Sequence, residues 1–215
     1  MGKPKLLIFA SGTVGGGGSG FENLVASSEL DADIVAVVSN HEQGGVRKRA
    51  EQLGVPFIYF NGPFDAEHYR TIVADSGAEW VALSGWMKQV VGLDPARTFN
   101  IHPAPLSYKG GHFGGSGMYG HNLHQKIAEA LERGEIAESA VAMHFVTDAI
   151  DGGPVFFERA VPLTKGMTGE EIQKAVNVAE HEWQPKITNL VVHGHIHWDG
   201  EDPASLIVPK NLGMV

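Results

Sequence analysis

The sequence has no cysteine among its 215 residues, which excludes disulfide bonds and cysteine-ligated metal sites. It is also poor in basic residues: 16 Lys and Arg stand against 25 Asp and Glu, a formal net charge of −9 at pH 7. A broad nucleic-acid-binding surface needs positive charge, so we expect no nucleic-acid partner. The first apolar run, residues 6–10, is too short for a secretion signal or a membrane span. We therefore expect a cytoplasmic protein without a membrane partner, and the sequence leaves a monomer or a homodimer open.

Short apolar segments alternate with amphipathic ones over the first half of the chain, a pattern typical of repeated β–α units. The strands predicted there are residues 6–10, 34–39, 57–60, 80–84 and 98–102, and the helices are residues 21–28, 46–53 and 66–76. In the second half we predict helices over 121–133 and 168–192, antiparallel strands over 140–146 and 155–161, and two short strands after Gly194. The fold class is therefore α/β: a single domain over residues 1–215 on a mostly parallel, twisted, Rossmann-like sheet. Residues 1–103 form a parallel half and residues 104–215 a mixed C-terminal half.

A first candidate site lies where the strand 98–102 ends, in Asn100-Ile101-His102-Pro103. Ligands of α/β proteins bind beyond the carboxyl ends of strands, and residues two apart on a strand share a face. An amide donor can stabilise a developing oxyanion, and an imidazole moves protons near neutral pH. Asn-x-His is also common by chance, so a structural histidine in the core is the better explanation of these residues when they are taken alone.

A second candidate is the loop after the strand 140–146, which contains Asp148, Asp151, Gly152 and Gly153. A carboxylate there could orient His102 and raise its basicity, and the glycines allow close approach of the backbone to a ligand. An ordinary turn capped by aspartate is the alternative.

The third candidate is the glycine-rich loop of residues 11–20, between a strand and a helix, where backbone amides can bind phosphate. Its glycines satisfy the dinucleotide spacing, but the second strand ends in Ser39-Asn40 rather than in an acid. No Gly-Lys-Ser/Thr follows either, so we expect neither a dinucleotide site nor a Walker loop. A flexible loop without a ligand is the alternative.

Histidines elsewhere are weaker candidates. His193, His195 and His197 alternate, so on a strand they would face one side and could bind a metal together with Asp199. Solvent-facing tail residues explain them as well, and we assign no metal ligand. His112, His121 and His124 border the long loop and could contact a substrate.

Taken together and in this order, these segments resemble the folate-dependent formyltransferases, from about residue 5 to residue 198. The most specific pieces are Asn100-Ile101-His102-Pro103 and residues 144–154, and Glu180-His181 on the long helix adds a third. The resemblance implies the formyltransferase fold. Residues 1–103 would form its nucleotide-binding half, and residues 104–215 its folate-binding and catalytic half.

The resemblance also implies the activity: transfer of a formyl group from 10-formyltetrahydrofolate, a co-substrate, to the amine of a phosphorylated acceptor, with no metal required. Glycinamide ribonucleotide in purine biosynthesis is the first candidate acceptor. Asn100 and protonated His102 would stabilise the oxyanion, and Asp151 would hold His102 and help to move a proton. The folate-binding residues would be Trp86, Met87, Lys88, Gln89, Val90, Val91, Val146, Thr147, Asp148 and Ile150. The acceptor phosphate would bind Gly12, Thr13, Gly15, Gly16, Gly17, Gly18, Ser19 and Gly20, and Glu180 would contact the acceptor's sugar or amine side.

Two loops depart from the family pattern. The glycine loop is longer than the usual Ser-Gly-x-Gly-Ser/Thr-Asn and displaces Asn23, and Ala104-Pro105-Leu106-Ser107 replaces the usual Ser-Leu-Leu-Pro. The segment after it, with Gly114 to Tyr119, resembles an insertion. We expect both loops near the acceptor, so other acceptors stay open: another amine such as an amino sugar nucleotide, or water in a formyltetrahydrofolate hydrolase. A folate- or nucleotide-binding module without turnover is the remaining alternative.

Overall fold

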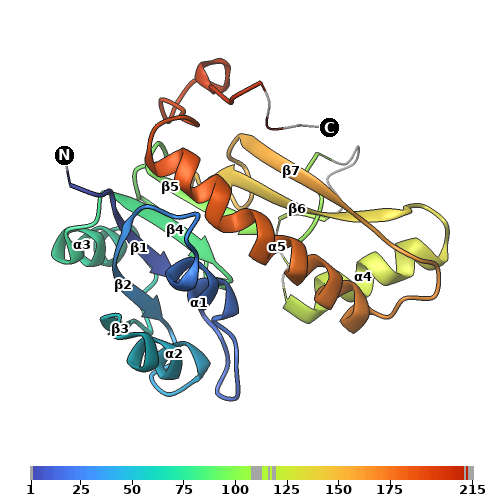
Figure 1. Cartoon of the computed structure of the whole chain (residues 1–215), viewed down its shortest axis with the longest axis horizontal. Helices are drawn as coiled ribbons and strands as arrows, with labels where there is room; N and C mark the ends of the chain where they lie inside the picture. The colour runs from blue at the N-terminus through green and yellow to red at the C-terminus, as the bar shows by residue number, and fades with distance from the viewer. Residues whose placement is uncertain (1, 108–112, 116, 118–119, 211, 213–215) are drawn as a thin grey trace.

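The structure, a computed structural model, describes residues 2–107, 113–115, 117, 120–210 and 212 (Figure 1). Its elements follow in the order β1 (Lys5–Phe9), α1 (Ser19–Ala26), β2 (Asp33–Ser39), α2 (Gly45–Leu53), β3 (Phe57–Tyr59), α3 (Ala66–Ser76), β4 (Trp80–Ser84), β5 (Thr98–His102), α4 (Gly120–Glu132), β6 (Glu138–Phe145), β7 (Val155–Pro162), α5 (Gly169–Val192) and the 3-10 helix η1 (Pro203–Ser205). The described strands form one sheet in the order β3-β2-β1-β4-β5-β6-β7. Strands β1 to β5 pair in parallel, whereas β6 pairs antiparallel with both β5 and β7. The predicted α/β domain with a mostly parallel sheet and a mixed C-terminal half is confirmed.

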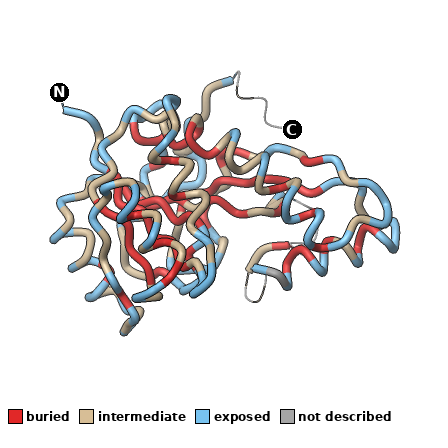
Figure 2. Tube along the Cα trace, turned by 60° about the horizontal axis from the view of Figure 1, so that its bottom comes forward, coloured by how far each residue is buried: buried red, intermediate tan, exposed pale blue. Residues whose placement is uncertain are grey.

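Alternate residues of the central strands serve two hydrophobic cores, one on each face of the sheet. On β1, Leu6 and Ile8 pack into the core beneath α1, α2, α4 and α5, whereas Leu7 and Phe9 pack into the core that contains Tyr69 of α3. These four side chains of β1 are fully buried, which explains the uninterrupted apolar run that follows Lys5. Figure 2 shows the buried residues running along the strands, with exposed residues on the outer surfaces of the helices.

The strand order reverses between β1 and β4, because β2 and β3 lie on one side of β1 and β4 and β5 on the other. Ligands of α/β sheets bind in the crevice at such a reversal. The loops that leave β1 and β4 are joined there: Ser11 N donates to Gly85 O at 3.0 Å, and Met87 N donates to Ser11 Oγ at 2.9 Å. This end of the sheet is where the candidate site lies.

Helix α5 crosses one face of the sheet and forms one wall of the site (Figure 1). It begins with the predicted capping box, in which the Thr168 side chain accepts from Glu171 N and the Glu171 side chain accepts from Thr168 N. Its buried face includes Ile172, Val176 and Ile187, as the helical spacing predicts.

The predicted elements before residue 194 all occur, with ends within two residues of those observed. The prediction of two strands after Gly194 is wrong. The described tail contains an isolated bridge between His197 and Ile207 and the short helix η1 instead. Across the described residues, no helix has both the length and the apolar character needed to cross a membrane.

Candidate functional site

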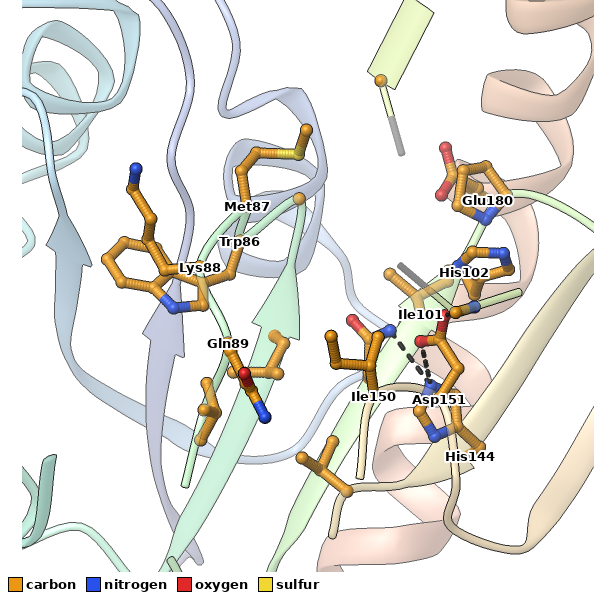
Figure 3. A pocket seen from close by; sticks show the side chains of 18 of the residues that line it. Trp86, Met87, Lys88, Gln89, Ile101, His102, His144, Ile150, Asp151 and Glu180 are labelled. Carbon is orange, nitrogen blue, oxygen red and sulfur yellow. Dashed lines mark hydrogen bonds and ion pairs between the residues drawn. The ribbon is translucent and has the colours of Figure 1, made fainter. Parts of the chain in front are cut away.

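A cavity of about 780 Å³ opens beyond the carboxyl ends of β4 and β5 and is closed on one side by α5 (Figure 3). Its walls come from β5, the loop after β4, the turn between β6 and β7, and the first half of α5. The three predicted catalytic residues, Asn100, His102 and Asp151, all line it. The structure thus brings together residues that lie 51 positions apart in the sequence.

A buried imidazole connects two of these residues. In the antiparallel pairing of β5 with β6, Asn100 lies opposite His144. Asn100 Nδ2 lies 3.1 Å from His144 Nε2, and His144 Nδ1 donates to Phe145 O at 2.7 Å. Asp151 Oδ1 lies 3.4 Å from the same His144 Nε2, as the dashed lines of Figure 3 mark. His144 is 2% exposed, so its ring fixes the positions of both the amide and the carboxylate.

Asp151 occupies a constrained turn. Its φ of 50° is the only positive value among the described non-glycine residues, and such a conformation persists only where surrounding contacts enforce it. Its Oδ2 accepts from Gly115 N at 2.7 Å. Burial opposes ionisation, but the His144 hydrogen bond, the charge of His102 and the Gly115 N–H together hold the pKa of Asp151 below its ordinary value. Asp151 is therefore a carboxylate at neutral pH.

His102 does not make the predicted hydrogen bond with Asp151. Its Nε2 donates to Phe113 O at 2.6 Å instead, so Asp151 acts on His102 only through its charge. Burial lowers the pKa of His102, and the charge of Asp151 and the Phe113 carbonyl only partly offset that effect. At pH 7 the ring of the unliganded protein is therefore neutral, with its proton on Nε2 and a lone pair on Nδ1, which favours a proton acceptor over the protonated group that the resemblance implies.

The predicted folate-binding segments face each other across the cavity. Of the ten predicted residues, eight line it: Trp86, Met87, Lys88, Gln89, Val90, Val146, Thr147 and Ile150. The other two, Val91 and Asp148, do not. Asp148 joins the two segments, since its carboxylate accepts from Gly92 N at 2.7 Å and its carbonyl from Gln89 Nε2 at 2.9 Å.

The loop after β4 is anchored from beneath by Tyr69 of α3. The Tyr69 hydroxyl donates to Gln89 O at 2.9 Å and accepts from Trp86 Nε1 at 3.1 Å. The Trp86 ring packs edge-on against Phe9, with ring centroids 5.3 Å apart. Trp86 is therefore largely a core residue that presents one edge to the cavity.

The glycine-rich loop folds into a tight hairpin, in which Thr13 N donates to Gly16 O at 2.8 Å and Gly16 N to Thr13 O at 3.3 Å. The hairpin packs on the start of α2, where Gly45 N donates to Thr13 O at 3.1 Å. A side chain at Gly17 would lie 2.4 Å from the Cα of Gly12, so this fold requires glycine there. Five of the predicted acceptor residues line neither the main cavity nor the smaller one beside the start of α1: Gly12, Thr13, Gly15, Gly16 and Gly17. The start of α1 does reach one, through Gly18, Ser19 and Gly20.

Glu180 of α5 lines the main cavity and a smaller one of about 150 Å³ beside the start of α1. Its Oε2 accepts from Asn177 Nδ2 at 3.3 Å. Burial raises the pKa of Glu180 to about 7, and the Asn177 hydrogen bond offsets only part of the rise. A carboxyl group that titrates at neutral pH thus stands between the two cavities.

Several lining residues had no assigned role in the sequence, among them His144, Ala149, Glu170, Gln173, Lys174 and Asn177. Asn177 had a signal, because a residue three positions before Glu180 shares its helix face. His144 begins the segment 144–154 that carries the resemblance, but no role followed for it, because the register of β5 against β6 cannot be read from the sequence.

Of the weaker histidine candidates that the structure describes, only His124 is found at the main cavity. The described residues include no group of three His, Asp or Glu side chains placed to hold a metal ion. His193 Nε2 contacts Asp31 O at 3.0 Å and His197 Nδ1 contacts Gly194 O at 3.0 Å, so the predicted shared face does not form. His124 lines the main cavity, whereas His112 and the side chain of His121 lie outside the described residues.

Comparison with known proteins gives consistent matches. A sequence model described as formyl transferase matches residues 4–188. The chain is 29% identical to "Phosphoribosylglycinamide formyltransferase, chloroplastic" of Arabidopsis thaliana, over 97% of this chain and 72% of that protein. It is 28% identical to "Phosphoribosylglycinamide formyltransferase" of Escherichia coli (strain K12), over 85% of this chain and 86% of that protein. Its fold resembles the crystal structure of glycinamide ribonucleotide transformylase 1 from Symbiobacterium toebii, with a TM-score of 0.78 at 23% identity over 96% of this chain and 95% of that one.

Proposed function

Because this chain belongs to the formyl transferase family, we propose that it transfers the formyl group of 10-formyltetrahydrofolate to the primary amine of glycinamide ribonucleotide. The observation that carries the proposal is the convergence of Asn100, His102 and Asp151 on one cavity. The nucleophile in this reaction is the acceptor's own amine. The protein therefore needs only to position the two substrates, stabilise an oxyanion and move a proton.

The folate end of the cavity lies between the loop after β4 and the turn between β6 and β7. The volume of about 780 Å³ falls in the range of cavities that hold ligands of this size. Val90, Val146 and Ile150 provide apolar surface for a pterin ring. Asp148, although it does not line this cavity, holds these two walls together through Gly92 and Gln89. Together with Trp86, Met87, Lys88 and Thr147, these groups form the proposed folate site.

Asn100 and His102 share one face of β5 at the end of this site. When the amine adds to the formyl carbon, negative charge develops on the formyl oxygen, and the Asn100 amide is placed to donate to it. Neutral His102 accepts the proton that the amine loses, because its Nδ1 carries a lone pair. The resulting imidazolium is stabilised by the Asp151 carboxylate and can return the proton to the departing folate nitrogen.

The acceptor occupies the other end, towards α1 and α5. The proposed phosphate site narrows to Gly18, Ser19 and Gly20, where the backbone N–H groups of the first turn of α1 have no helical partners. Glu180 lies between this point and His102 and is placed to accept from a sugar hydroxyl. We keep the cytoplasm, and a monomer or homodimer, as the expected location and assembly.

An assay with a panel of acceptors tests the proposal. Purified protein is incubated with 10-formyltetrahydrofolate and glycinamide ribonucleotide, an amino sugar nucleotide, or no amine, and tetrahydrofolate release is followed by absorbance. Of these three incubations, we expect only the one that contains glycinamide ribonucleotide to release tetrahydrofolate. Release without any amine would identify a hydrolase, and faster release with the amino sugar nucleotide would reassign the acceptor.

A further inference from the structure

The smaller cavity has a buried polar floor that the reaction described above does not use. Ser84 ends β4 and Gln184 lies on α5, 100 residues later in the sequence, and both line this cavity. Ser84 is 7% exposed and Gln184 is 1% exposed. Their only described link is a long hydrogen bond, in which Ser84 Oγ donates to Gln184 Oε1 at 3.4 Å.

The buried side-chain amide of Gln184 makes fewer hydrogen bonds than it could. A primary amide has two N–H donors and an acceptor oxygen with two lone pairs. Among the described residues, its Nε2 makes no hydrogen bond, and its oxygen makes only the long one to Ser84. Burying an amide without such bonds costs on the order of 1–3 kcal/mol, so buried polar groups are normally paired. A buried amide that faces a cavity with free donors is instead placed for a polar ligand.

The floor lies directly against the start of α1. A side chain at Gly20 would lie 2.3 Å from Ser84 Oγ and 3.1 Å from Gln184 Oε1, so the two groups touch the first turn of the helix. The residue before that turn is Gly18, which has no side chain to cap the free N–H groups. Backbone donors and the positive end of the helix dipole therefore meet the Gln184 amide in one cavity of about 150 Å³. That volume is sufficient for a phosphate group.

We propose that Gln184, supported by Ser84, binds the phosphate of the acceptor from beneath and so determines specificity for phosphorylated amines. This assignment rests on the proposed function, because it places the phosphate of the same acceptor. The Gln184 amide donates to a phosphate oxygen while the N–H groups of Ser19 and Gly20 donate from above. Ser84 fixes the amide by donating to its oxygen. Glu180, at the junction with the main cavity, separates this subsite from the reacting amine.

The test compares Gln184→Leu and Ser84→Ala with a matched control, Thr188→Val. Thr188 lies one helical turn after Gln184, is 0% exposed, has an unpaired hydroxyl and lines neither cavity. Its replacement therefore reports the generic effect of removing a buried polar group from this face. Binding of ribose 5-phosphate and of inorganic phosphate is measured by calorimetry, and KM is measured for both substrates.

We expect Gln184→Leu to weaken binding of ribose 5-phosphate and to raise KM for the acceptor by about tenfold or more, as for loss of one hydrogen bond to a charged group. Ser84→Ala should have a smaller effect in the same direction, and KM for the folate should change in neither. Thr188→Val should behave as wild type. Unchanged phosphate binding in a folded Gln184→Leu protein overturns the proposal, as does an equal loss in Thr188→Val. If Gln184→Leu does not fold, unchanged binding in Ser84→Ala overturns it.

The two proposals fail in different ways. Phosphate binding that depends on Gln184, in a protein that transfers no formyl group, would remove the proposed function and leave the phosphate subsite. Formyl transfer by Gln184→Leu with the wild-type KM for the acceptor would remove the phosphate subsite and leave the proposed function.

Discussion

The Asp151 carboxylate lies 3.4 Å from Nε2 of His144, not on His102, and the same nitrogen lies 3.1 Å from the Asn100 amide. One buried ring thus fixes two of the three groups to which we assign catalysis. Replacing His144 should free the Asn100 amide and the Asp151 carboxylate from this contact. His144→Phe keeps most of the volume but removes the hydrogen bond that lowers the pKa of Asp151, while burial of that carboxyl remains.

We therefore expect the pKa of Asp151 to rise in His144→Phe. In the wild type, Asp151 stays ionised until the pH falls below its ordinary value of 3.8. In the variant, its protonation and the accompanying loss of activity should begin at a higher pH. A carbon-13 titration of the Asp151 carboxyl measures the shift directly. An unchanged titration would show that His144 does not control this carboxylate.

His102→Ala and Asp151→Ala should reduce turnover on the order of a hundredfold or more, because each removes a group that acts on the developing charge or its proton. Binding of the folate should largely survive, since its proposed contacts are elsewhere. The exposed pair His68–Asp65, with 2.7 Å between Nδ1 and Oδ1, is a matched control, and His68→Ala should leave turnover unchanged. Near wild-type rates in either catalytic variant would contradict the assignment.

The pH profile should carry the signature of His102. Its pKa is lowered by burial from the ordinary 6.5, so the neutral base persists below that value. At saturating concentrations of both substrates and in the Glu180→Gln background, which removes the other group that titrates near neutral pH, we expect His102 to cause no loss of kcat above its ordinary pKa of 6.5 and a loss only below it. In that background, a fall in kcat that begins above pH 7 would mean that the essential base is not a histidine with a lowered pKa.

Glu180 should make the protein less stable as the pH rises. Its pKa is about 7 in the folded state, above the ordinary 4.5, so the native state holds a proton that the unfolded state has released between these values. Stability from this group is complete below pH 4.5 and is lost as the pH approaches and passes 7. Glu180→Gln should therefore raise the melting temperature at pH 8 and have little effect at pH 4.5. A larger effect at the lower pH would refute this account.

Glu158 of β7 holds the backbone that follows His102. Its Oε2 accepts from Leu106 N at 2.9 Å and Ser107 N at 3.0 Å, and Ser107 Oγ donates to Oε1. An amide in its place can still accept at its single oxygen, but its NH₂ group cannot accept from the Ser107 hydroxyl. Glu158→Gln should thus loosen this segment and lower kcat several-fold, and Glu158→Ala should lower it further. The exposed Glu138 is the control, and equal losses in Glu138→Gln would show that the segment is not specifically held.

Much of this site could be predicted from the sequence, because strand ends and helix faces have regular spacing. Asn100 and His102 share a face by the two-residue period of a strand, whereas the role of Glu180 came from the resemblance to the formyltransferases. The pairing of β5 with β6, which brings His144 to Asn100, depends on register between strands 44 residues apart. The sequence does not encode that register locally, so His144 received no role.

The glycine loop shows a different limit. Glycines permit many backbone conformations, so their spacing alone could not distinguish a phosphate loop from the hairpin that packs on α2. Gln184 illustrates a third limit of prediction from the sequence. Its place on α5 is typical of a core position, and only the neighbouring cavity shows that this residue borders open space.

The central claim is transfer of the formyl group to the amine of glycinamide ribonucleotide, and following the transferred carbon tests it most directly. The 10-formyltetrahydrofolate is labelled with carbon-13 in its formyl group. The account predicts that the NMR signal of the folate N-formyl group is replaced by that of an N-formyl group on the acceptor, and that the rate is strongly reduced in His102→Ala. Label that appears as free formate, or that stays on the folate in the presence of the acceptor, would contradict it.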